Sequence, residues 1–147
     1  MPPRLVIDTN VFVSGLISGA GSPSKILRAI REKKVIHLVS DSIVEEYLRV
    51  LEYPRIRKFK KITDAFIADI AAYAIYQTER VELVSTIKIS RHPADDIFLQ
   101  TAVDGRADLS ISGDKTDLLA LRVVEKGIPI VSASEAVVRL GLLISLK

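Results

Sequence analysis

The chain has 147 residues, of which 48% are hydrophobic, and its net charge is +3. This length suits one compact core, so we expect a single domain over residues 1–147. The absence of cysteine excludes disulfides, thiolate metal sites and cysteine nucleophiles. No apolar run reaches the roughly 18–20 residues of a membrane span, so we expect a cytoplasmic protein with no membrane partner. The mild positive charge is compatible with a phosphate-backbone partner and equally with an ordinary soluble protein.

Short aliphatic runs alternate with helical patterns along the chain. In chain order, the expected elements are a strand over 4–8, a helix from about residue 10, a helix over 23–31, a strand over 35–39, a helix over 41–51, a basic connector over 55–61, a helix over 62–78, a strand over 81–84, a helix over 93–105, a strand over 109–112, a helix over 116–124, a strand over 129–131 and a helix from the cap Ser134 to Gly141. Strands that are aliphatic on both faces predict a mostly parallel sheet covered on both sides, in a three-layer α/β/α domain.

Two acidic residues follow expected strands at their C-terminal ends. Asp8 ends the first strand, and Asp114 comes just after the strand over 109–112. Ligands of open α/β sheets bind outside these ends, so two central strands would bring both carboxylates together. The alternatives are that Asp8 caps the next helix and that Asp114 is an ordinary turn residue.

The helix over 93–105 supplies two further acids. Asp95 shares a helical face with Leu99 and Ala102. A carboxylate on such an apolar face is costly unless it is paired or binds a metal. Asp96 lies at the edge of this face. The alternative for both acids is the favourable position of negative charge in the first turn of a helix.

The helix over 41–51 supplies one more candidate. Glu46 flanks its apolar face, whereas Glu45 lies on its polar face, and a solvated glutamate is the alternative. Carboxylates gathered at one point repel one another, and a divalent cation removes that repulsion. Oxygen ligands select hard ions, Mg²⁺ or Mn²⁺, and such a cluster suits phosphodiester hydrolysis. We expect His37 to be structural and His92 exposed, which argues against a zinc site.

Four motifs resemble those of the PIN domain family, in the family's order and over nearly the whole chain. They are residues 6–11 (VIDTNV), 46–51 (EYLRVL) with Pro54, 93–99 (PADDIFL) with Ala102, and 107–114 (ADLSISGD) with Leu118 and Leu119. Each motif alone is weakly specific, and the four together are fairly specific. The resemblance implies a ribonuclease that acts on single-stranded RNA with Mg²⁺ or Mn²⁺.

The resemblance also implies roles for individual residues. The metal-binding and catalytic acids would be Asp8, Glu46, Asp95 and Asp114. The supporting polar residues would be Asn10, Ser112, Asp96 and Asp117. Many small bacterial and archaeal members are VapC-like toxins, which are held inactive by an antitoxin and are commonly dimeric. An antitoxin partner and a homodimer are therefore implied, and the apolar tail over 140–146 is a candidate for packing on the domain or in a dimer interface.

The connector over 55–61 carries five positively charged residues, and the aromatic Phe59 lies between them in the sequence. One hypothesis is that it holds an RNA backbone while Phe59 stacks on a base. The candidate cations are Arg57, Lys58, Lys60 and Lys61. The alternative, which we favour, is a solvated connector with Ile56 and Phe59 packed inward.

Three other classes of protein share parts of this pattern. A receiver-like signalling module needs an acidic pair after the first strand, whereas Asp8 stands alone. A phosphatase with an Asp-x-Asp-x-Thr motif needs a second aspartate where this chain has Asn10. A catalytically silent PIN-like protein would bind RNA or a partner without cutting, but every motif acid is present here. We therefore favour the nuclease.

Overall fold

The computed structural model describes residues 1–84, 93–113, 123–124 and 127–141, and for 93–95 and 123–124 it describes the backbone alone. The strands are β1 (Arg4–Ile7), β2 (Ile36–Val39), β3 (Glu79–Arg80), β4 (Leu109–Ile111), β5 (Val123–Val124) and β6 (Ile128–Val131). The helices are α1 (Thr9–Ile17), α2 (Ser22–Arg31), α3 (Asp41–Leu51), α4 (Pro54–Arg57), α5 (Asp64–Tyr76), α6 (Pro93–Asp104) and α8 (Ala133–Arg139).

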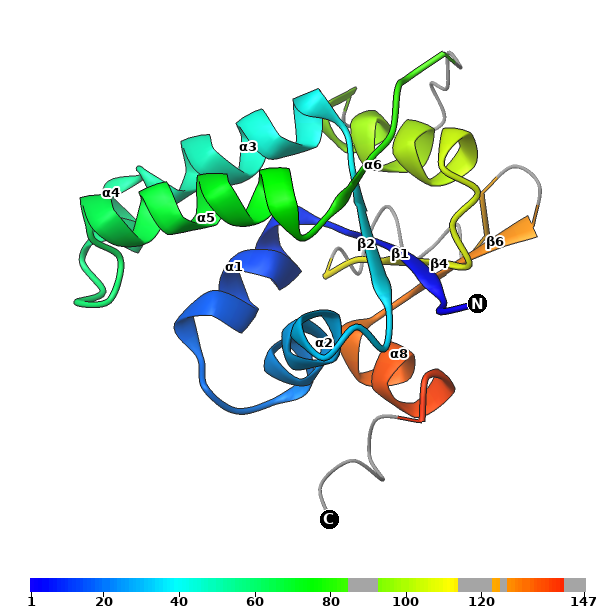
Figure 1. Ribbon diagram of the computed structural model, residues 1–147, viewed down its shortest axis with the longest axis horizontal. Coiled ribbons are helices and arrows are strands. Elements are labelled where there is room, and N and C mark those ends of the chain that lie inside the picture. The colour runs from blue at the N-terminus through cyan, green and yellow to red at the C-terminus, as the bar shows by residue number, and fades with distance from the viewer. Residues whose placement is uncertain (85–92, 114–122, 125–126, 142–147) are drawn as a thin grey trace.

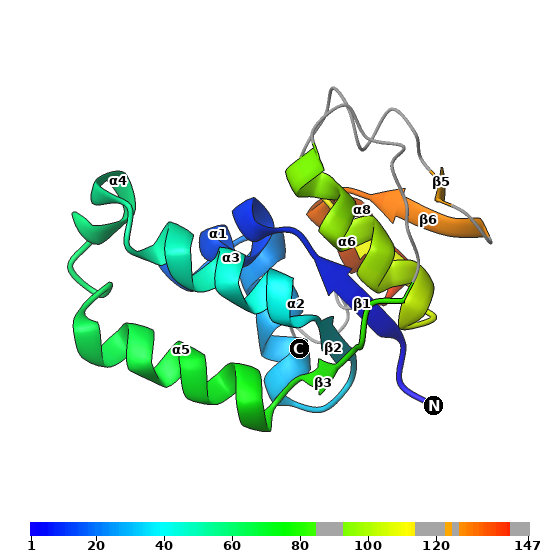
Figure 2. The ribbon, with the colours of Figure 1, turned by 90° about the horizontal axis from the view of Figure 1, so that it is seen from above.

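The strands form one sheet in the order β3-β2-β1-β4-β6-β5, and every pair except β5–β6 is parallel. In Figure 1, α3, α5 and α6 lie above the sheet, and α2 and α8 lie below it. Figure 2, seen from above, shows α6 crossing the central strands while α3 and α5 extend past one edge of the sheet. The expected three-layer α/β/α fold with a mostly parallel sheet is confirmed.

The centre of the sheet is the core of the protein because its strands are covered on both faces. Leu5, Val6 and Ile7 of β1 are fully buried, as are Leu38 and Val39 of β2. Parallel sheets covered on both faces have such uninterrupted aliphatic strands. The strand order changes direction between β1 and β4, because the chain adds β2 and β3 on one side of β1 and then β4 and β6 on its other side. This switch point is where open α/β sheets bind ligands.

Side-chain caps define where several helices begin. Ser40 caps α3 by accepting from the Ile43 amide at 3.3 Å. The predicted cap Ser134 is wrong, because α8 is capped two residues earlier by Ser132. There, the Ser132 hydroxyl accepts from the Glu135 amide and the Glu135 carboxylate accepts from the Ser132 amide, at 3.2 and 3.3 Å. This reciprocal capping box satisfies two amide donors, which explains why the earlier serine is the cap.

Other boundaries also differ from the prediction. The strand expected over 81–84 lies at Glu79–Arg80 instead, where both residues are exposed at the sheet edge and Arg4 pairs with Glu79 at 2.5 Å. Pro54 does not simply end α3 but begins the short helix α4, since a proline suits the first turn of a helix. Of the helix expected over 116–124, residues 116–122 lie outside the described residues. Its last two residues form β5, antiparallel to β6.

No helix in the described parts of the chain combines the length and the apolar character needed to cross a bilayer.

Candidate active site

The carboxylate of Asp8 joins the C-terminal ends of β1 and β4. Its Oδ1 accepts from the Val11 amide at 2.9 Å, which makes Asp8 the N-cap of α1. Its Oδ2 accepts from the Ser112 hydroxyl at 3.0 Å and the Gly113 amide at 2.9 Å, both just beyond β4. Asp8 is 8% exposed. The cap and the strand-end position, which the sequence posed as alternatives, therefore occur together.

A chain of hydrogen bonds supports β1 immediately before Asp8. The Tyr47 hydroxyl, on α3, donates to the carbonyl oxygen of Ile7. The same hydroxyl lies 3.1 Å from Nε2 of His37, whose Nδ1 lies 2.8 Å from the Tyr73 hydroxyl. Because Tyr47 uses its proton on Ile7, the consistent tautomer of His37 donates from Nε2 and accepts at Nδ1. Side chains of α3, α5 and β2 thus fix the backbone next to the candidate acid.

Burial keeps this hydrogen-bonded chain neutral. It lowers the pKa of His37 from 6.5 to about 3, because a charged imidazole would lose its hydration. Burial also raises the pKa of Tyr47, with smaller contributions from Tyr73 and from the negative charge of Asp8. The ring of Phe12 stacks on Tyr47 with centroids 4.1 Å apart. The buried and hydrogen-bonded His37 therefore has a structural role, as expected.

Glu46 has a different environment from Asp8. It is half-buried on α3, with 19% of its side chain exposed, and it forms an ion pair with Arg49 one turn along the helix. Its neighbour Glu45 is exposed. Glu46 and Arg49 line a shallow pocket of about 540 Å³ that Ile97 of α6 closes on one side. The Glu46 carboxylate therefore lies next to the open space between α3 and α6, and it is paired with the guanidinium of Arg49.

The remaining predicted acids are only partly described. The backbone places Asp95 in the first turn of α6, one turn before Leu99, which is fully buried. Asp96 is described in full and is 8% exposed. Asp114, Asp117 and His92 lie outside the described residues. The structure therefore brings Asp8 and Ser112 together, and it leaves the convergence of the four acids as a prediction.

The donor set at the β1–β4 corner fits a hard divalent cation. All of the candidate ligands are carboxylate oxygens, which Mg²⁺ and Mn²⁺ prefer. The hydrogen bonds from Val11, Ser112 and Gly113 orient the carboxylate of Asp8. Within the part of the chain that the structure describes in full, no three His, Asp or Glu side chains surround a common point.

The basic connector does not behave as one surface. Arg57 pairs with Asp64 at 2.5 Å and with Glu52 at 3.7 Å. Lys61 donates to the carbonyl oxygens of Leu16 and Ile17, at the C-terminus of α1, at 2.8 and 3.3 Å. These two predicted RNA contacts are therefore engaged in the fold.

Two other cations of the connector are available at the surface. Lys58 and Lys60 are exposed. Ile56 is buried as expected, whereas the inward packing expected for Phe59 is wrong, because its side chain is 39% exposed.

Sequence reasoning missed two contributors to this region. Tyr47 was not predicted to have a role of its own, and its hydroxyl contact with β1 has no sequence signal. Arg55 was left out of the candidate RNA contacts, yet it lines the same pocket as Asn10. The detectable signal was its spacing, because Arg55 and Lys58 are three residues apart and therefore share a face of a helix that begins at Pro54.

The chain is similar to a family model, to a curated protein and to a solved structure. A family model described as PIN domain matches residues 4–116. An uncharacterized protein of Methanocaldococcus jannaschii is 33% identical over 119 residues, which cover 81% of this chain and 75% of that protein. A solved structure of the PIN domain endonuclease Utp24 is 23% identical, with a TM-score of 0.48, and the match covers 88% of this chain and 84% of that one.

Proposed function

The chain belongs to the PIN domain family, and we propose that it is a metal-dependent endoribonuclease that hydrolyses phosphodiester bonds in single-stranded RNA. Proteins of this family are generally nucleases and generally use divalent metals, so a nuclease acting on nucleic acid is the expected activity. The observation that carries the proposal here is the position of Asp8. A buried carboxylate is held at the switch point of the sheet by donors from two different segments, which is the arrangement of a preorganised site.

The candidate residues divide into metal ligands and supporting residues. Asp8, Glu46, Asp95 and Asp114 would hold Mg²⁺ or Mn²⁺. When bound, such an ion activates water and offsets the negative charge of the phosphate. Ser112 keeps Asp8 oriented by donating to its Oδ2. Asn10, exposed two residues after Asp8, is placed to contact the strand being cut.

We also propose a biological role for this chain, as a VapC-like toxin that is neutralised by an antitoxin. It would act in the cytoplasm as one PIN-like domain over residues 1–147. A homodimer is supported by the C-terminal end of α5, where Ile75 and Tyr76 are 65% and 81% exposed. Of the apolar tail over 140–146, residues 142–146 lie outside the described residues. A monomer at high concentration in sedimentation would contradict the dimer.

Cleavage of labelled single-stranded RNA tests the activity. Wild-type protein should cut with Mn²⁺ or Mg²⁺ and should not cut with EDTA. Asp8→Asn and Asp95→Asn should abolish metal-dependent cleavage. Asp69→Asn is the matched control. Asp69 is an exposed acid on α5, so its substitution removes the same charge away from β1.

Two outcomes would contradict the proposal in different ways. Cleavage that persists in EDTA or in Asp8→Asn would show that the acids are not the catalytic centre. A folded wild-type protein that binds metal without cutting RNA would instead be a silent PIN domain with a binding role.

A further inference from the structure

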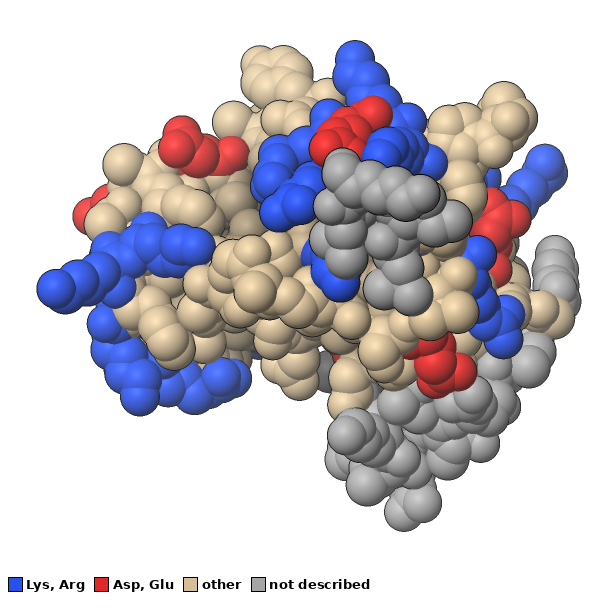
Figure 3. All heavy atoms as spheres, turned by 90° about the horizontal axis from the view of Figure 1, so that it is seen from below, with Lys and Arg blue, Asp and Glu red and all other residues tan. Residues whose placement is uncertain are grey.

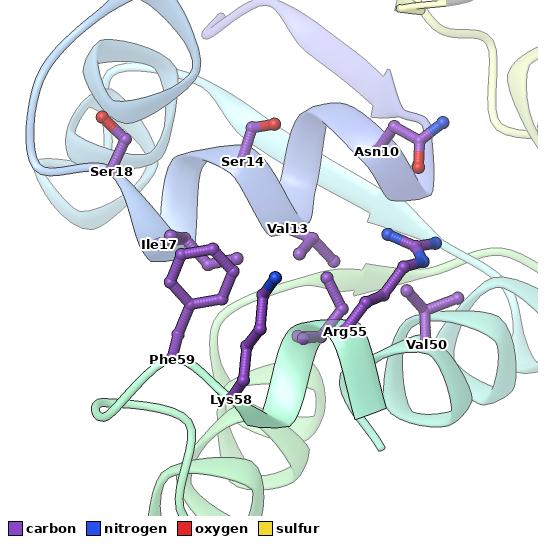
Figure 4. A pocket seen from close by; sticks show the side chains of 10 residues that line it. Asn10, Val13, Ser14, Ile17, Ser18, Val50, Arg55, Lys58 and Phe59 are labelled. Atoms are coloured by element: carbon purple, nitrogen blue, oxygen red, sulfur yellow. The ribbon is translucent and has the colours of Figure 1, made fainter. Parts of the chain in front are cut away.

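A groove runs between α1 and α4, beginning next to the candidate active site (Figure 4). Its volume is about 480 Å³. The apolar floor includes Val13 and Ile56, and Asn10 lies at one end, two residues from Asp8. Phe59 lies beside Ile17 at the other end. We call this feature the α1–α4 groove.

The charge of the α1–α4 groove is entirely positive. Arg55 and Lys58 line it, and none of its lining residues is acidic. Figure 4 shows both side chains pointing from α4 across the groove toward α1. Within the described parts of the chain, neither cation forms an ion pair. Arg55 instead lies over the Tyr53 ring, 5.6 Å from its centroid, which holds the guanidinium in place.

The other cations of the connector differ from Arg55 and Lys58 in their partners. Arg57 and Lys61 of the same connector are used inside the fold, by two carboxylates and by the C-terminal carbonyls of α1. Arg55 and Lys58, on the groove side, form no ion pair within the described residues and remain available for a ligand, as does the exposed Lys60. Figure 3 shows Lys and Arg side chains gathered at the end of the molecule that α4 and its connector form. The groove therefore opens into a positive surface.

These features fit a single strand of nucleic acid. Phosphates supply the negative charge that complements Arg55 and Lys58, and the exposed ring of Phe59 offers a stacking face for a base. The floor from Asn10 to Ser18 spans about 12 Å at the rise of an α-helix. At roughly 3.4 Å per nucleotide of a stacked strand, that length accepts about three nucleotides. A strand in the groove would then continue past Asn10 toward Asp8.

We propose that the α1–α4 groove binds the segment of single-stranded RNA next to the cut site, with Arg55 and Lys58 on phosphates and Phe59 stacked on a base. This proposal rests on the proposed ribonuclease function and assigns the substrate path of that same site. This assignment changes the RNA contacts that the sequence predicted. Lys58 is kept as a contact and Arg55 is added, whereas Arg57 and Lys61 are removed.

Fluorescence anisotropy of a short labelled single-stranded RNA in EDTA tests the groove without cleavage. The double variant Arg55→Gln/Lys58→Gln should weaken binding about tenfold or more. It should also reduce the slope of log affinity against log salt by about 1.4, because each single-strand phosphate contact contributes about 0.7. Phe59→Leu keeps an apolar side chain but loses the stacking face, and should weaken binding about fivefold or more without changing the salt slope.

Two control pairs make the assignment specific. Arg28→Gln/Arg139→Gln removes the same charge from exposed positions on α2 and α8 and should change affinity by less than about twofold. Arg57→Gln/Lys61→Gln removes charge from the same connector and should lower the thermal stability rather than the salt slope. Equal loss of affinity for all three pairs would overturn the proposal, since it would indicate attraction by net charge alone.

The remaining outcomes separate this proposal from the nuclease proposal. Wild-type cleavage with unchanged binding by the groove variants would overturn the groove and leave the nuclease intact. Groove-dependent RNA binding without any cleavage would support the groove and contradict the nuclease. Absence of wild-type RNA binding even at low salt would overturn the groove proposal, and binding of an acidic peptide instead would assign the groove to a protein partner.

Discussion

Asp8 and Glu46 are both candidate metal ligands, but the fold treats them differently. Asp8 is buried and accepts hydrogen bonds from Val11, Ser112 and Gly113, which belong to two segments distant in sequence. Among the described residues, Glu46 forms its ion pair with a neighbour on its own helix, the exposed Arg49. If the proposed metal site is correct, the fold already orients Asp8 at the β1–β4 corner, whereas Glu46 would have to exchange Arg49 for the metal ion.

The largest expected effect separates these two acids by activity. Asp8→Asn keeps a side chain that can cap α1 but removes the charge, and it should reduce RNA cleavage by at least about 10²-fold. Glu46→Gln should reduce cleavage less, because Arg49 already neutralises part of that charge. Rates measured with saturating Mn²⁺ check this order. Equal losses, or a larger loss for Glu46→Gln, would show that preorganisation does not distinguish the two positions.

The second prediction concerns the support behind Asp8. Tyr47→Phe removes the donor to the Ile7 carbonyl and leaves the Nε2 proton of His37 without its partner. We expect a loss of about 1–3 kcal/mol in the free energy of unfolding, because buried polar groups become unsatisfied. Urea denaturation measures this value. Tyr76→Phe, at an exposed hydroxyl, is the control and should stay within about 0.5 kcal/mol of wild type.

The third prediction uses acid to weaken the same support. The pKa of His37 is about 3 in the folded protein and 6.5 without burial, so the unfolded state binds a proton that the folded state excludes. Stability is therefore full above about pH 6.5 and falls by about 1.4 kcal/mol per pH unit below it, until the folded pKa is reached. Urea denaturation at several pH values should show this slope. A His37→Gln variant with the same slope as wild type would assign the acid sensitivity to other groups.

The smallest expected effect is on the α3 side. Arg49→Gln removes an exposed partner of Glu46 and should change the unfolding free energy by less than about 0.5 kcal/mol, as is usual for surface ion pairs. Because the carboxylate is released, Mn²⁺ affinity should rise by up to about fivefold, corresponding to about 1 kcal/mol. Calorimetric titration with Mn²⁺ measures the change. A weaker affinity would mean that Arg49 positions Glu46 rather than competing for it.

The sequence predicted those parts of the fold that depend on local pattern. The aliphatic runs located β1, β2, β4 and β6. The edge strand β3 was misplaced because Glu79 and Arg80 are exposed, so an edge strand held by ion pairs carries no hydrophobic signal. The helix predicted through Val124 failed at its end because Val123 and Val124 pair with β6, and aliphatic residues alone do not distinguish the two structures.

The candidate site was predictable only where a residue's position along an element decides its role. The location of Asp8 after a buried strand predicted its place at the switch point, and β1 and β4 do lie side by side. The contact between Tyr47 and Ile7, and the use of Arg57 and Lys61 within the fold, depend on tertiary packing. Residue type and spacing contain no information about such partners.

The central claim is that the β1–β4 corner anchors a divalent cation through Asp8. Calorimetric titration of folded protein with Mn²⁺, comparing wild type with Asp8→Asn and the control Asp69→Asn, tests it most directly. We predict that wild type and Asp69→Asn bind Mn²⁺ alike and that Asp8→Asn loses at least about 10-fold in affinity. Unchanged Mn²⁺ binding by a folded Asp8→Asn variant would contradict the account, since the preorganised carboxylate would then hold no metal.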